Sequence, residues 1–94
     1  MKRAYLLVYS DQLGSREQVK DCLNTMPEVL TWRHDLPHAF YFISTAEANA
    51  LAKIIRDRLG SGRFIVSEVP LNKGGWLPGE TWYLLNRKER KPRP

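Results

Sequence analysis

The hydrophobic pattern begins with a continuous apolar run and then changes to helical spacing. Residues 3–9, RAYLLVY, are apolar at both odd and even positions, which predicts a central strand covered on one side and aromatic on the other. Ser15 and Gln18 then match a capping box and predict a helix of about 11 residues. Its buried stripe consists of apolar residues three or four positions apart: Val19, Cys22, Leu23 and Met26.

The middle of the chain predicts a hairpin and a second helix. Residues 29–34, VLTWRH, and 38–44, HAFYFIS, are two strand-like runs around a short turn, DLP. Ser44 with Glu47 matches another capping box, and Gly60 lies where a C-terminal stop is expected. The apolar face of this helix contains Ala48, Leu51, Ala52, Ile55 and Leu59.

A last strand-like run, RFIVSEV at residues 63–69, gives the order strand, helix, strand, strand, helix, strand. This order predicts an α+β protein of the ferredoxin-like type, βαββαβ, with a four-stranded antiparallel sheet and two helices on one face. If Leu6 and Val8 face these helices, Tyr5 and Tyr9 face the open side of the sheet. The alternation leaves open which face of the third strand joins them.

A C-terminal extension follows the fourth strand. Pro78 can begin a short helix that holds Trp82 and Leu85. These side chains and Trp76 are too apolar to remain in water, so we expect the segment to pack on the domain or on a partner.

The composition is typical of a single globular domain, which we place at residues 1–86. The chain has 94 residues, 43% of them hydrophobic and 27% charged. No apolar run approaches the ~20 residues of a membrane span, and MKRAYLLVYSDQ lacks the pattern of a signal peptide. A single cysteine, Cys22, excludes an intramolecular disulfide and a multi-cysteine zinc site. We therefore expect a cytoplasmic protein without a membrane partner.

The net charge of +5 is concentrated at the C-terminus. Residues 87–94, RKERKPRP, have a net charge of +4, and the preceding 86 residues have a net charge of +1. Two interpretations stay open: a disordered, solubilising tail, or a segment that contacts the phosphates of a nucleic acid. In the second case the binding residues are the five cations of the tail: Arg87, Lys88, Arg90, Lys91 and Arg93.

The most distinctive stretch is EVPLNKGGWLPGETWYLL, residues 68–85. With the predicted element order, it resembles the SinR-like group of small proteins, in the wider superfamily of the second CRISPR-associated protein and the VapD toxins. The resemblance covers residues 3–86 and implies a ferredoxin-like fold and a homodimer. It places four residues after the fourth strand at the dimer interface: Trp76, Leu77, Trp82 and Leu85.

For the nuclease members of this superfamily, the resemblance implies an Asp at the end of the first strand that faces its twin in the dimer. Such paired carboxylates hold a divalent metal, Mg²⁺ or Mn²⁺, which makes Asp11 the catalytic and metal-binding candidate. Ser10 occupies the position directly after Tyr9, so Asp11 fits this role only if the strand has ended or bulged. The alternative is that Asp11 serves in a turn or cap.

Other candidate residues have two interpretations each. His34 and His38, with Asp35 between them, suggest a zinc site, or they are surface residues of a turn without a further ligand. Phe40 and Phe42 either stack on RNA bases from the open sheet face or belong to the core.

These patterns leave three classes of function. The leading one is a small dimeric nucleic-acid-associated protein. The alternatives are a divalent-metal-dependent endonuclease that acts on RNA or DNA through paired Asp11, and a structural or protein-interaction dimer.

Overall fold

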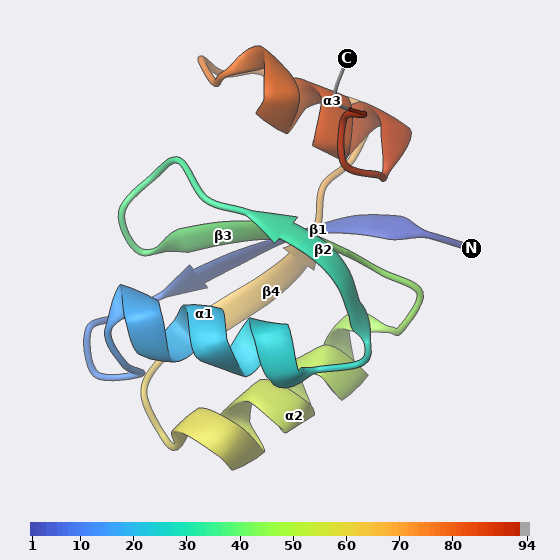
Figure 1. Cartoon of the computed structure of the whole chain (residues 1–94). Coiled ribbons are helices and arrows are strands. Elements are labelled where there is room, and N and C mark those ends of the chain that lie inside the picture. Colours follow the sequence, from blue (N-terminus) through green and yellow to red (C-terminus); the bar gives the residue numbers. More distant parts are fainter. Residues whose placement is uncertain (93–94) are drawn as a thin grey trace.

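The computed structural model describes residues 1–92 and is an α+β protein (Figure 1). In chain order, the elements are β1 (Arg3–Tyr9), α1 (Arg16–Thr25), β2 (Val29–Arg33), β3 (Ala39–Ser44), α2 (Ala48–Leu59), β4 (Phe64–Glu68) and α3 (Gly79–Arg87). The predicted order of strands and helices is confirmed, and so is the short C-terminal helix.

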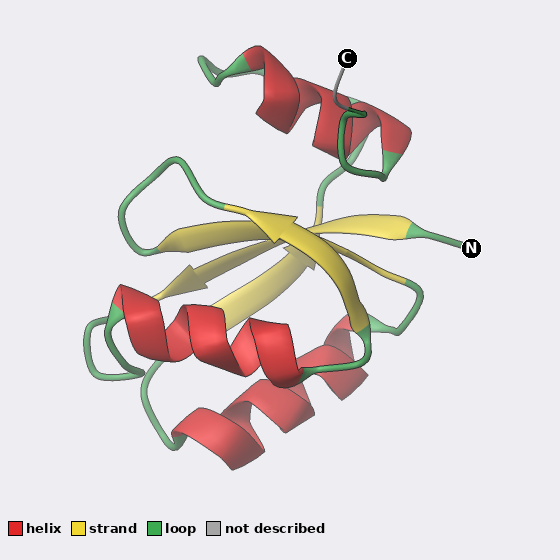
Figure 2. Ribbon diagram, in the orientation of Figure 1, coloured by secondary structure: helices red, strands yellow, loops and turns green. Residues whose placement is uncertain are grey.

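The four strands form one sheet in the order β2-β3-β1-β4, and all neighbouring strands are antiparallel. Helices α1 and α2 lie on one face of the sheet and α3 lies on the other (Figure 2). β2 and β4 are therefore the edge strands. The pairing of β2 with β3 is interrupted by a bulge at Leu30, whose side chain is exposed.

The main core lies between the sheet and the helices α1 and α2. Tyr5, Leu7 and Tyr9 of β1 point into it together with Phe40 and Phe42 of β3. The condition that Leu6 and Val8 face these helices is not met, so the tyrosines do not face the open side; the two apolar faces had left the orientation of the strand undetermined. The hypothesis that the two phenylalanines stack on bases was wrong, since both are fully buried.

A second core lies on the opposite face, under α3. Leu84 and Leu85 pack there against Ala4, Tyr41 and Ile43 of the sheet. The face expected to be open is thus partly covered by the chain itself.

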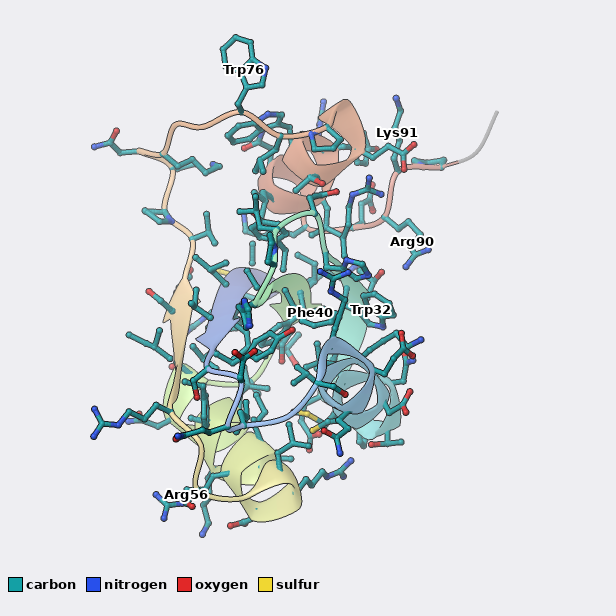
Figure 3. The ribbon with its side chains drawn as sticks, turned by 90° about the vertical axis from the view of Figure 1, so that its left-hand side faces the viewer. Trp32, Phe40, Arg56, Trp76, Arg90 and Lys91 are labelled. Carbon is teal, nitrogen blue, oxygen red and sulfur yellow. The ribbon has the colours of Figure 1, made fainter. Side chains whose placement is uncertain are left out.

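The residues expected at a dimer interface divide into two groups. Leu85 is buried in the second core, and Leu77 and Trp82 pack against it, half-buried. Trp76 is 99% exposed and projects away from the domain (Figure 3). Only Trp76 of the four leaves its whole side chain available to a partner.

The two predicted capping boxes had different outcomes. Ser15 caps α1 as expected, with both reciprocal hydrogen bonds to Gln18 present. The box at Ser44 was wrong: its hydroxyl accepts from the backbone N–H of Ala46, 3.0 Å away, and α2 begins after Glu47. Gly60 ends α2 as predicted, in a conformation with φ of 101° that favours glycine.

Among residues 1–92, no helix combines the length and the apolar character that a membrane crossing requires.

We expect the substitution Leu85→Ala to lower the free energy of unfolding by about 2–5 kcal/mol, because it leaves a cavity under α3. Chemical denaturation at several protein concentrations measures this loss. The loss should not depend on concentration, since Leu85 packs within one chain. The control, Thr45→Ala at an exposed turn position, should change the value by less than about 0.5 kcal/mol. A loss seen only where the protein associates would instead assign Leu85 to an interface.

Candidate functional site

A cleft of about 550 Å³ lies where the edge strand β2, helix α3 and the residues after α3 meet. Its walls combine aromatic, acidic and basic side chains: Trp32, His34, Arg33, Glu80, Arg90 and Lys91. It is therefore the place where the basic C-terminal residues meet aromatic residues of the sheet.

A hydrogen-bonded cluster joins β2 to the first turn of α3. Arg33 Nε donates to Thr81 Oγ1 at 2.6 Å, and its Nη1 donates to Glu80 Oε2 at 3.0 Å. The buried Thr81 hydroxyl in turn donates to Asp35, whose other carboxylate oxygen lies 3.5 Å from Arg33 Nη2. Burial, and secondarily the charge of Asp35, raise the pKa of Tyr41. The cluster holds α3 at the β2 side of the sheet and neutralises Arg33.

A pair of aromatic residues lies at the β2 border of the cleft. Trp32 and His34 are two residues apart, so their side chains share one face of the strand. Their rings are 9° from parallel with centroids 5.9 Å apart, and each meets the buried ring of Phe40 at 70°. Trp32 Nε1 also donates to Asn24 Oδ1 at 2.6 Å. These contacts on several sides hold the ring pair in one orientation.

The chain reverses direction after α3. Lys88 adopts a left-handed conformation with φ of 59°, and its N–H donates to the carbonyl of Leu84 at 2.8 Å. The following residues return over β2, where Arg90 Nε donates to Thr31 Oγ1 at 3.2 Å and Nη2 donates to the Trp32 carbonyl at 3.3 Å. Figure 3 shows Arg90 on the side of the molecule where Trp32 lies, and Lys91 further away, at the level of α3.

The five basic residues predicted for nucleic-acid binding thus occupy different positions. Arg87 is the last residue of α3, and Lys88 caps that helix. Arg90 and Lys91 line the cleft, and within residues 1–92 no carboxylate lies at ion-pair distance from either. Arg93 lies outside the described residues.

Asp11 lies in a turn beyond the end of β1. The strand ends at Tyr9, and the N–H of Leu13 donates to the carbonyl of Ser10 at 3.0 Å. The hydroxyl of Ser10 is buried, without a hydrogen-bond partner in the part of the chain described. The Asp11 side chain is 91% exposed, so the two neighbours point in opposite directions.

The carboxylate of Asp11 is engaged by a histidine from the β2–β3 turn. Asp11 Oδ1 and His38 Nε2 are joined by a hydrogen bond, and the backbone carbonyl of His38 accepts from Tyr9 N–H at 3.0 Å. The ring of His38 also lies 5.7 Å from that of Tyr9. Burial raises the pKa of Tyr9, and the nearby charge of Arg16 acts in the opposite direction.

A single chain gives a metal ion few ligands near Asp11. Among residues 1–92, no group of three His, Cys, Asp or Glu side chains is close enough together to hold a metal. His34, suggested as a zinc ligand with Asp35 and His38, instead packs against Trp32 and Phe40. A metal shared between two Asp11 carboxylates would need a second copy of the chain, and this pairing stays a prediction.

Comparison with known proteins adds no assignment. Neither a scan against protein-family models nor a search of curated proteins finds a match for this chain. The resemblance to the SinR-like group therefore stays a prediction, and the function has to be argued from the residues of the site.

Sequence reasoning missed the cleft, although one signal was present. Trp32 and His34 are two positions apart in a predicted strand, so a shared face was predictable. No comparable signal pointed to Thr81, because its partners Arg33 and Asp35 are distant in sequence.

We expect Thr81→Val to destabilise the fold by about 1–3 kcal/mol, because it keeps the shape but removes the hydroxyl that pairs with Asp35 and Arg33. Urea denaturation followed by circular dichroism measures the change. Thr45→Val, at an exposed turn position, is the matched control and should stay within about 0.5 kcal/mol. Equal stability of both variants would show that the cluster does not hold α3.

Proposed function

We propose that this protein is a small nucleic-acid-binding module whose binding surface is the cleft between β2 and α3. The observation that carries the proposal is that Arg90 and Lys91 line the same cleft as the ring pair of Trp32 and His34. Cations for phosphates beside flat rings for bases are the combination by which proteins hold nucleic acids.

The distribution of charge supports the same function. The part of the chain before residue 87 has a net charge of only +1, so its overall electrostatic attraction for a polyanion is small. The return of the chain after Lys88 brings cations to one edge of the sheet. In the cleft, Glu80 is the acidic side chain, and it is paired with Arg33, which also lies near Asp35.

The fold belongs to the same proposal. We propose that it is ferredoxin-like and that the chain is a relative of the SinR-like group. The strand order β2-β3-β1-β4, with α1 and α2 on one face, supports this assignment. The proposed homodimer is supported by Trp76 and Leu71, two large apolar side chains left exposed beyond β4.

We expect the double variant Arg90→Ala/Lys91→Ala to bind labelled oligonucleotides about 10-fold more weakly than the unchanged protein at low salt. The plot of log affinity against log salt has a negative slope, and the magnitude of this slope should fall by roughly 1 to 2. Each lost phosphate contact lowers that magnitude by a little less than one. Fluorescence anisotropy across a salt series measures both quantities.

The matched control is Lys53→Ala/Arg56→Ala, which removes the same charge from exposed positions of α2, away from the cleft (Figure 3). It should retain most of the affinity. Equal weakening by both double variants would mean that net charge alone attracts the nucleic acid. Absence of binding to RNA and DNA would contradict the proposal.

A second candidate function is metal-dependent cleavage at Asp11. It is favoured by the end of β1 at Tyr9, which frees Asp11 from the alternation of the strand, and by the exposure of its carboxylate. Against a metal role within one chain stands the hydrogen bond to His38.

For this candidate we expect cleavage of labelled RNA or DNA with Mg²⁺ or Mn²⁺ and none with EDTA, with loss of cleavage in Asp11→Asn. Gel electrophoresis of the incubated oligonucleotides measures the product. Asp21→Asn, an exposed carboxylate of α1, is the matched control and should cleave normally. Unchanged oligonucleotides under every metal condition would remove Asp11 from the catalytic residues and leave the binding function in place.

A further inference from the structure

We propose that the cleft is a binding site for one unpaired nucleotide of a single strand, whose base stacks on the Trp32–His34 ring pair and whose phosphate is held by Arg90, with Lys91 placed for the next phosphate of the strand. This inference rests on the proposed function and names its ligand. It is carried by four features of the cleft.

The first feature is that the ring pair is already in place. Trp32 is held by Phe40 and by its hydrogen bond to Asn24, and His34 is held by Phe40 and Trp32. Both residues are only partly buried, and both line the cleft. A base that stacks on them therefore does not have to immobilise these side chains. Such immobilisation usually costs conformational entropy when a ligand binds.

The second feature is that a cation lies next to the residue that provides the stacking surface. Arg90 Nη2 donates to the backbone carbonyl of Trp32, the same residue that provides the larger ring. The charge therefore lies beside the backbone of the residue that carries the aromatic surface. In a nucleotide, the base and the phosphate are also neighbours, since one sugar joins them. One nucleotide can therefore contact both the aromatic residue and the cation.

The third feature is that the present bonds of Arg90 are easily exchanged. Its two acceptors on β2 are an uncharged hydroxyl at 3.2 Å and a backbone carbonyl at 3.3 Å. A phosphate oxygen accepts shorter and stronger hydrogen bonds from a guanidinium than neutral oxygens do. The guanidinium can therefore exchange these acceptors for a phosphate with little movement.

The fourth feature is the acidic wall formed by Glu80. Arg33 is shared between Glu80 and Asp35, so one negative charge remains and disfavours a phosphate on the α3 side. The phosphate is directed toward Arg90, and the base toward β2. The bases of a duplex are already stacked on one another, so their faces cannot reach a ring pair inside a cleft.

The test compares four probes on the unchanged protein by fluorescence anisotropy and competition. These are a single strand of about 12 nucleotides, the same strand with abasic sites, its duplex, and a free nucleoside monophosphate. We expect the single strand to bind about 10-fold more tightly than the abasic strand and the duplex. The monophosphate should compete weakly, because it offers no second phosphate to Lys91 and its neighbours.

Variants then locate the stacking contact. His34→Ala and Trp32→Leu should abolish the preference for the single strand over the abasic strand while retaining the salt-dependent part of the affinity. Trp76→Leu is the control and should retain the preference. Circular dichroism shows which variants fold, and because the probe comparison uses the unchanged protein, misfolding of one variant leaves the proposal testable.

The outcomes separate this inference from the function on which it rests. Equal binding of abasic and normal strands, or of duplex and single strand, would overturn the stacking site and leave electrostatic binding intact. Competition by the monophosphate as strong as by the strand would assign the cleft to a free nucleotide and overturn the strand as ligand. If no probe binds, the proposed function fails as well.

Discussion

The structure depends on one constraint, which is that the central strands β1 and β3 are apolar on both faces. A strand of this kind is stable in water only if both sides of the sheet are covered. Helices α1 and α2 cover one side with a large aromatic and aliphatic core. The other side is covered by α3, which contributes Leu84 and Leu85. The terminal helix is therefore part of the domain that the strands require.

The position of α3 also determines where the basic residues lie. Arg33 and Thr81 join the edge strand to the start of the helix, and Lys88 turns the chain back at its end. Arg90 then reaches the backbone of β2. The cleft thus forms because α3 packs over the second core. The basic residues lie near Trp32 because α3 ends close to β2.

What the sequence predicted well were features decided by near neighbours. The Ser15 cap and the Gly60 stop depend on residues within one helical turn, so local spacing was sufficient. The Ser44 cap failed because an equally local bond to Ala46 competes with it. Arg33 and Arg90 find partners 48 and 59 positions away, and no periodicity encodes such pairs. The orientation of β1 was undetermined because either face could form the core.

The bond from Arg90 to the Trp32 carbonyl has a further consequence for the behaviour of the chain in a concentrated solution. Edge strands with free carbonyls and N–H groups can add strands of other molecules, and proteins protect them with bulges and charged side chains. β2 carries a bulge at Leu30 and a guanidinium over its outer edge. Both features are of the kind that discourages edge-to-edge pairing, and one of them comes from the C-terminal residues. If a ligand displaces Arg90 from β2, the ligand itself has to cover the Trp32 carbonyl.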